Sequence, residues 1–168
     1  MAEFNKNMLS PVGFNFNILR APDLNFFVQS INVPGIQVGA YEQPTPFKTI
    51  PRAGDHIIYG DIQLTFKINE DLSNYIAMFN WITGLGFPDE FKQYSDLANN
   101  PSYSGDGLYS DGNVMILSSS MNPLVRIDFK DMFPVGLTDI TLDTRDSAIE
   151  YIEASVTFKF KNYTFTPV

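Results

Sequence analysis

The stretch Asp61–Pro88, DIQLTFKINEDLSNYIAMFNWITGLGFP, decides the fold because its hydrophobic period changes in the middle. From Asp61 to Ile68, apolar and polar side chains alternate strictly. The apolar positions are Ile62, Leu64, Phe66 and Ile68, and the polar positions are Asp61, Gln63, Thr65 and Lys67. Successive side chains of a strand point to opposite faces, so this pattern predicts a strand with one buried face.

After Asn69 the apolar spacing becomes helical, at steps of three and four residues. The stripe consists of Leu72, Tyr75, Ile76, Phe79 and Ile82. It predicts a helix that turns this stripe toward the core. Asn69 can accept a backbone N–H at the helix start, and Gly84, Gly86 and Pro88 end the helix. We interpret the single tryptophan, Trp81, as a packing residue of this helix.

Other apolar or alternating runs predict the remaining strands. They cover residues 14–20, 24–33, 114–117, 125–130, 137–142 and 150–163, with turns expected at 21–23 and 131–136. About seven or eight strands and one helix are typical of a mainly β protein. We therefore expect an antiparallel β-sandwich or barrel with one flanking α-helix and a long extended arm, formed by a single domain over residues 1–168.

The expected arm is residues 34–55, which hold Pro34, Pro44, Pro46 and Pro51 among several glycines. The Pro-x-Pro spacing forces an extended backbone that lacks ladder donors. A surface loop between strands is one interpretation, and an arm that buries its apolar residues against a neighbouring subunit is the other. Loops of this length in compact domains usually have a function. The inter-subunit arm candidates are Tyr41, Pro44, Pro46, Phe47 and Ile50.

Residues 87–113 are predicted to be an irregular loop insertion. Their tail, SYSGDGLYSDGN, superficially resembles a calcium-binding loop. However, Asp106, Asp111 and Asn113 do not fall on alternate ligand positions, and no glutamate closes the loop. The pattern therefore indicates a polar, glycine-rich, exposed loop.

The composition favours a β protein without a catalytic centre. The chain contains 15 Phe and 8 Tyr, which favour strands, and it has no cysteine. The missing cysteines exclude disulfides, thiolate metal sites and thiol nucleophiles. The only histidine, His56, precedes Ile57-Ile58 at an expected strand start, where a plain strand-end residue is commoner than a member of a Ser–His–Asp arrangement. No glycine loop is placed to cradle a phosphate. We therefore predict no enzymatic activity, no cofactor and no metal.

The charge and hydropathy patterns indicate whether the chain binds nucleic acid or enters a membrane. A net charge of −8, with no cluster of Lys or Arg, argues against specific nucleic-acid binding. No apolar run approaches the roughly 18 residues needed to cross a membrane, and the N-terminus lacks a secretory pattern. We expect no membrane insertion by this chain.

Four segments occur in an order that resembles the tail tube proteins of contractile-tailed, T-even-type bacteriophages. The segments are VPGIQVG (33–39), EQPTPFKTIPRAGD (42–55), DIQLTFKINEDLSNYIAMFNWI (61–82) and IEYIEASVTFKFKNY (149–163). The resemblance implies a homohexameric ring that stacks into a helical tube, surrounded by a sheath protein and bounded by baseplate and tail terminator proteins. It also implies a virion protein that is assembled in the host cytoplasm, with DNA passing through the lumen without specific binding.

An acidic chain would line such a lumen with charges that repel phosphate. The first candidate wall is the strand 150–163, and the second is the strand 61–68. The lumen-facing candidates are Glu153, Ser155, Thr157 and Lys159 on the first, and Asp61, Gln63, Thr65 and Lys67 on the second. Lys159 and Lys161 would weaken a uniformly acidic lining.

Other functions stay open from the sequence. A baseplate tube initiator or a secretion-tube ring would share the same fold. A carbohydrate-binding β-sandwich could use Tyr103 and Tyr109 in the glycine-rich loop. A hydrolase built on His56 is the weakest alternative.

Overall fold

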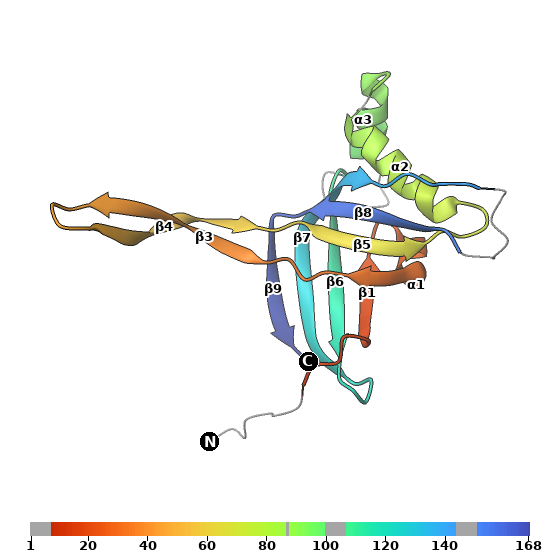
Figure 1. The fold of residues 1–168 in the computed structure, drawn as a ribbon. Coiled ribbons are helices and arrows are strands. Elements are labelled where there is room, and N and C mark those ends of the chain that lie inside the picture. The colour runs from red at the N-terminus through yellow and green to blue at the C-terminus, as the bar shows by residue number, and fades with distance from the viewer. Residues whose placement is uncertain (1–7, 87, 100–106, 144–150) are drawn as a thin grey trace.

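A computed structural model describes residues 8–86, 88–99, 107–143 and 151–168. Within them, nine strands and three helices follow one another along the chain (Figure 1). The strands are β1 (Phe14–Ile18), β2 (Val28–Ile31), β3 (Ile36–Pro44), β4 (Thr49–Tyr59), β5 (Ile62–Lys67), β6 (Ser110–Leu117), β7 (Pro123–Leu137), β8 (Glu153–Lys159) and β9 (Asn162–Pro167). The helices are α1 (Pro22–Phe27), α2 (Ser73–Gly86) and α3 (Phe91–Ala98).

Two antiparallel layers share the long strand β7. Its first part pairs with β6 and β9, and its second part pairs with β8. Strand order is β1-β6-β7-β8-β5-β2, with β9 attached to β7. In Figure 1 the strands β1, β6 and β9 run across the direction of β5 and β8. The mainly β, antiparallel prediction is confirmed, and the arrangement is sandwich-like rather than a closed barrel.

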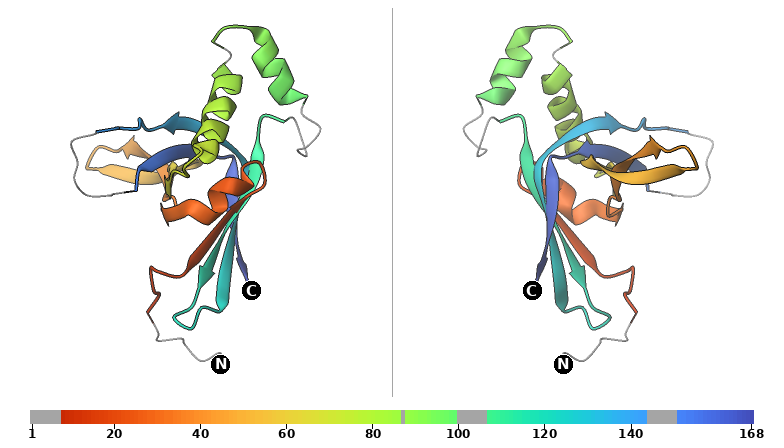
Figure 2. Two further views of the ribbon diagram at one scale, coloured as in Figure 1. Left: turned by 90° about the vertical axis from the view of Figure 1, so that its right-hand side faces the viewer. Right: turned by 90° about the vertical axis from the view of Figure 1, so that its left-hand side faces the viewer.

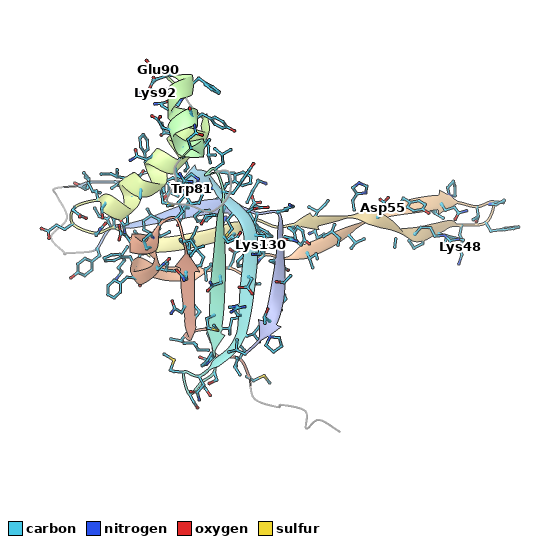
Figure 3. The ribbon with its side chains drawn as sticks, turned by 180° about the vertical axis from the view of Figure 1, so that it is seen from behind. Lys48, Asp55, Trp81, Glu90, Lys92 and Lys130 are labelled. Atoms are coloured by element: carbon cyan, nitrogen blue, oxygen red, sulfur yellow. The ribbon has the colours of Figure 1, made fainter. Side chains whose placement is uncertain are left out.

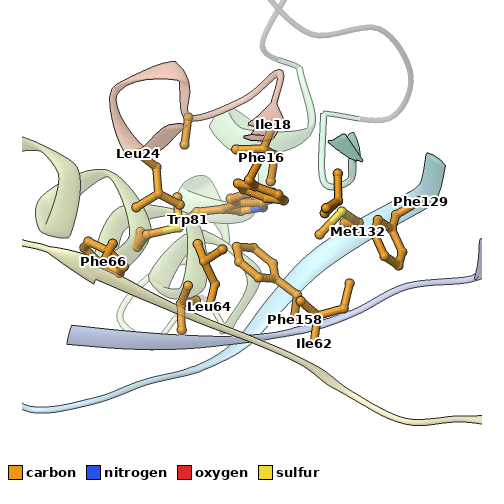
Figure 4. Close-up of a cluster of buried hydrophobic side chains, with 14 of the residues drawn as sticks. Phe16, Ile18, Leu24, Ile62, Leu64, Phe66, Trp81, Phe129, Met132 and Phe158 are labelled. Carbon is orange, nitrogen blue, oxygen red and sulfur yellow. The ribbon is translucent and has the colours of Figure 1, made fainter. Parts of the chain in front are cut away.

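The core lies between the two layers and under α2 (Figure 4). The alternation predicted in the opening stretch is confirmed, since Ile62, Leu64 and Phe66 of β5 are fully buried. Strand β8 contributes Val156 and Phe158 in the same way. Trp81 is 2% exposed, and its ring centroid lies 6.0 Å from that of Phe158. Its indole Nε1–H donates to the Leu108 carbonyl at 2.9 Å, which satisfies its one polar group.

The turn predicted at 21–23 was wrong, and so was the first part of the strand predicted at 24–33. Pro22 begins the short helix α1, where its fixed φ and missing N–H suit the first turn. Leu24 is fully buried beneath this helix. Only Val28–Ile31 pairs with β5, with a register shift between Val28 and Ser30.

The predicted core stripe of α2 was also wrong. The buried positions are Asn74, Met78, Trp81 and Gly84, whereas Leu72, Ile76 and Phe79 are exposed. The reason is a polar anchor that sets the rotation of the helix. The Asn74 Nδ2 donates to the Lys67 carbonyl at 2.8 Å, and the Asn74 N–H donates to Asn69 Oδ1 at 3.2 Å. The last contact confirms the predicted capping role of Asn69.

Residues 87–113 are not one irregular loop, and α2 is not the only helix. Helix α3 occupies Phe91–Ala98, and β6 begins at Ser110. Leu97 of α3 packs close to Gly84 of α2, where an added Cβ would lie 3.1 Å from its side chain. Tertiary packing on a small residue therefore stabilises a short helix that the sequence pattern does not show. Figure 2 shows α2 and α3 as a helical pair that projects from the sheets.

The predicted turn at 131–136 lies inside β7, and no strand forms at 138–142. Asp131 has a φ of 52°, and the register shifts again between Pro134 and Gly136. These irregularities bend β7 from one layer into the other. The expected last strand, residues 150–163, divides in the same way into β8 and β9. Lys161 donates its N–H to the Lys130 carbonyl at 3.0 Å at the point of division.

The predicted arm is a two-stranded β-hairpin, β3–β4, which extends from Ile36 to Tyr59 and beyond the predicted bounds of 34–55. It projects away from both layers (Figure 1). Its base is held by aromatic packing, with the Tyr59 ring 5.5 Å from the rings of Phe160 and Tyr163. The Tyr163 hydroxyl also donates to the Pro34 carbonyl at 3.2 Å. These contacts fix the direction in which the arm leaves the body.

Candidate assembly surfaces

The lumen-facing candidates form one polar face on two adjacent strands. Antiparallel pairing sets Gln63 opposite Thr157, Thr65 opposite Ser155, and Lys67 opposite Glu153. Asp61, one residue before β5, reaches Lys159 with an Oδ1–Nζ distance of 3.1 Å. The two predicted walls are therefore a single surface, which we call the β5–β8 polar face.

Hydroxyl and charged groups are ordered along this face. Thr65 Oγ1 and Ser155 Oγ lie 2.9 Å apart near its middle. The Asp61–Lys159 pair lies at one end, and Lys67 and Glu153 lie at the other. The Lys67 ammonium also lies 5.2 Å from the centroid of the Tyr151 ring. The face therefore offers polar groups that are largely engaged with one another.

A second polar face, on β6, β7 and β9, was missed in the sequence. Three ion pairs follow it: Arg126–Asp128 at 2.9 Å, Lys130–Asp111 at 2.8 Å and Lys161–Asp131 at 3.5 Å. The alternation of Arg126, Asp128 and Lys130 was a signal for an exposed face. Which of these charged side chains form ion pairs depends on the register between the strands, and the sequence pattern does not give that register.

The carboxylate of Asp111, on this second face, accepts hydrogen bonds from both Lys130 and the Asp131 backbone. Partial burial raises the pKa of Asp111, but hydrogen bonds from Lys130 and from the Asp131 N–H, with the charge of Lys130, outweigh it. The net result is a lowered pKa. The same hydrogen bond and charge raise the pKa of Lys130. This pair braces the bend of β7 next to Asp131, which donates its N–H to Asp111 Oδ1 at 3.1 Å.

The arm candidates lie near the tip of the hairpin, with large apolar side chains in solvent. Phe47 is 98% exposed and Tyr41 is 58% exposed, while Pro44 and Pro46 are exposed and Ile50 is half-buried. Further apolar residues along the hairpin were not among the candidates, and they are Ile36, Val38, Ile57 and Ile58. Figure 3 shows the hairpin side chains, including Lys48 and Asp55, projecting into space on both sides of the ribbon. An isolated hairpin with so much apolar surface is typical of a contact element.

A second apolar surface lies beside α2. Ile76 and Phe79 of α2, with Leu72 directly before the helix, form an exposed stripe. A groove of about 920 Å³ adjoins its start and is lined mainly by apolar residues, among them Phe26, Phe27, Ile68, Leu72, Tyr151 and Ile152. Its polar lining residues are Gln29, Lys67, Asn69 and Glu70, and they include no Ser, Thr, Cys or His that could form a nucleophile–base pair.

The residues suggested for other chemistry are not assembled into a site. His56 Nδ1 lies 2.5 Å from Asp55 Oδ1, and both side chains are almost fully exposed on the hairpin. Tyr109 packs edge-on against Phe133 at 5.6 Å, while Tyr103 lies outside the described residues. Across the described ranges, no group of three or more His, Cys, Asp or Glu side chains is placed to hold a metal ion. No described helix has the length and apolar character needed to cross a membrane.

Comparison with protein-family models decides the family. The model described as phage tail tube protein matches residues 2–166. The chain belongs to the phage tail tube protein family. Its members are structural proteins of the tube in a phage or injection-system tail, and the predicted resemblance is confirmed at the level of the family.

Solved structures agree with the tail tube fold. The anti-feeding prophage tube-terminating cap superposes with a TM-score of 0.67 at 14% identity, covering 100% of this chain and 97% of that one. A chain of the PVC extracellular contractile injection system sheath–tube complex gives a TM-score of 0.62 at 12% identity, covering 97% and 94%. A chain of the anti-feeding prophage baseplate gives 0.61 at 10% identity, covering 91% and 90%. No curated protein matches the sequence.

Proposed function

We propose that this tail tube protein self-assembles into hexameric rings that stack into the inner tube of a contractile tail. The tube is the conduit through which DNA is ejected into the host. The observation that carries the proposal is the β3–β4 hairpin. Tyr59 packs at its base, but Tyr41 and Phe47 toward its tip are exposed and do not belong to the core of the described residues. Burial against a neighbouring copy would remove these side chains from water, at about 25 cal/mol for each Å² of apolar surface.

Open strand edges support ring formation. Among the described strands, β1 and β2 end the path of the paired sheet. An unpaired edge presents free N–H and C=O groups that can pair with an edge of another chain. Pairing of such edges between neighbouring copies would continue the sheet around a closed ring, which gives these edges a partner.

The partners follow from the same proposal. The similar chains come from a tube-terminating cap, a sheath–tube complex and a baseplate. We infer that this protein contacts a sheath protein along its outer surface, and baseplate and terminator proteins at the tube ends. Its role is structural rather than enzymatic, and its place is the phage tail, assembled in the host cytoplasm.

Replacing apolar residues at the hairpin tip tests the assembly role. The variant Tyr41→Ser/Phe47→Ser should remain a folded monomer but fail to form tubes, because both side chains are already exposed in the monomer. Size-exclusion chromatography and negative-stain electron microscopy measure assembly, and circular dichroism measures folding. Lys48→Ser, at the same tip, is the matched control and should assemble normally. Tubes of normal length from the double variant would contradict the role of the arm.

A baseplate initiator or a secretion-tube ring is the second candidate, favoured by the similarity to a baseplate chain. Electron microscopy of the wild-type protein separates the two. Long stacked tubes support the tube role, whereas single rings that do not stack support the initiator role.

A further inference from the structure

The charges on the strands of the body are balanced. Strands β1, β2 and β5 to β9, with the flanking Asp61 and Lys161, contain five acids and five bases. The acids are Asp61, Asp111, Asp128, Asp131 and Glu153, and the bases are Lys67, Arg126, Lys130, Lys159 and Lys161. The full chain has 19 acids and 11 bases, so its net charge of −8 lies entirely in the rest of the sequence.

The balance is local as well as numerical. Four of the five acids and their bases form ion pairs with N–O distances from 2.8 to 3.5 Å. The remaining two, Lys67 and Glu153, lie opposite each other in the register of β5 and β8. Each polar face of the body is therefore neutral by itself. This holds for the β5–β8 polar face and for the face on β6, β7 and β9.

We propose that the wall of the tube channel carries no net charge, so that DNA is neither held nor repelled by it. This inference rests on the proposed function, and it holds whichever of the two sheet faces lines the channel. It replaces the expectation of an acidic lining drawn from the net charge of the chain. Part of the acidic surplus instead lies in and beside the helical pair. Glu70 and Asp71 precede α2, Asp89 and Glu90 lie between α2 and α3, and α3 holds Asp96 and one base, Lys92.

The pairing of each lysine with an acid matters in a tube of stacked rings. A lysine without its acid would be repeated around every ring and along every layer of the tube. Such a lattice of free ammonium groups binds phosphates and releases their counterions, which makes DNA retention strong and dependent on salt. The acids at Asp61 and Glu153 therefore keep Lys159 and Lys67 from becoming a DNA-binding track.

Assembled tubes test this directly. Tubes are mixed with a fluorescent single-stranded DNA oligonucleotide, treated with nuclease and sedimented, so that only DNA inside the channel survives. Wild-type tubes should protect no DNA above background. Asp61→Asn/Glu153→Gln tubes should protect DNA at about 50 mM salt and lose roughly tenfold or more of it at about 200 mM salt.

Two further variants complete the design. Asp61→Asn/Lys159→Gln removes one whole pair without changing the net charge, and its tubes should behave as wild type. Asp111→Asn/Asp128→Asn frees Lys130 and Arg126 on the other face, and retention by this variant alone would assign that face to the channel. If the first double variant does not form tubes, Glu153→Gln alone, which frees Lys67, takes its place.

The inference is overturned if wild-type tubes protect DNA in a salt-dependent manner. It is also overturned if neither charge-adding variant protects more DNA than wild type, because an acidic wall would absorb the added charge. Electron microscopy of the wild-type protein is scored separately, and an absence of tubes there contradicts the proposed function instead.

Discussion

At the scale of single residues, the Asp111–Lys130 pair joins β6 to β7 where β7 bends. Asp111 accepts hydrogen bonds from the Lys130 ammonium and from the Asp131 N–H. Asp131 has a positive φ, a conformation that non-glycine residues adopt at a cost. The carboxylate of Asp111 therefore compensates for a strained position at the junction of the two layers.

The lowered pKa of Asp111 predicts the pH range in which this pair stabilises the fold. The folded pKa lies below the ordinary value of 3.8, so the contribution is fully present above pH 3.8 and is lost as the pH falls through the lowered pKa. Asp111→Asn should be less stable than wild type at neutral pH, by less than about 1 kcal/mol because water screens a half-exposed pair. Urea denaturation at several pH values measures the difference. A gap between the two proteins that grows as the pH falls below 3.8 would contradict this assignment.

At the scale of elements, the β3–β4 hairpin depends on a close approach of its two strands. A Cβ added at Gly54 would lie 2.6 Å from the Gly39 carbonyl oxygen, at a register shift in the hairpin. A strand glycine at such a contact is typical where two backbones meet. The hairpin is thus a specific structure rather than a loose proline-rich loop.

We predict that Gly54→Ala destabilises the hairpin alone, by about 1–3 kcal/mol. Hydrogen exchange of residues 36–59 should accelerate, while the thermal midpoint of the body stays unchanged because the hairpin lies outside the core. Gly39→Ala is the matched control, since an added Cβ there meets nothing within 4 Å. Equal acceleration in both variants would show that the close contact at Gly54 is not the cause.

At the scale of the whole molecule, β7 couples the two layers by belonging to both. Phe158 of β8 is fully buried at the centre of the core, where its ring lies next to that of Trp81. We predict that Phe158→Ala lowers the free energy of unfolding by about 3–5 kcal/mol. Circular dichroism should follow a single transition in wild type and variant, because neither layer retains its packing without the shared strand. Two separated transitions would contradict this coupling.

Phe47→Ala is the control for that experiment. Its side chain is 98% exposed at the hairpin tip, so the free energy of unfolding of the monomer should not change. Because the same residue is an arm candidate, its effect should appear in assembly rather than in folding.

The local patterns alone predicted the fold class, the burial of β5 and β8, the capping by Asn69 and the presence of an arm. The alternation of Ile62, Leu64 and Phe66 sufficed because a strand of period two has only two faces. The residues of the polar face were predictable for the same reason. Their partners were not, because cross-strand pairing depends on register between segments about ninety residues apart in the chain.

Other features were decided only by tertiary structure. The face of α2 that enters the core depends on the anchor between Asn74 and Lys67, and apolar periodicity does not report such a polar contact. Helix α3 depends on Leu97 packing beside Gly84, and the continuity of β7 depends on the two layers that it joins. The sequence by itself determined which side chains share a face of each strand, because that is set by local backbone geometry. The tertiary structure determined which faces meet and which charges cancel, because these depend on contacts between residues distant in the chain.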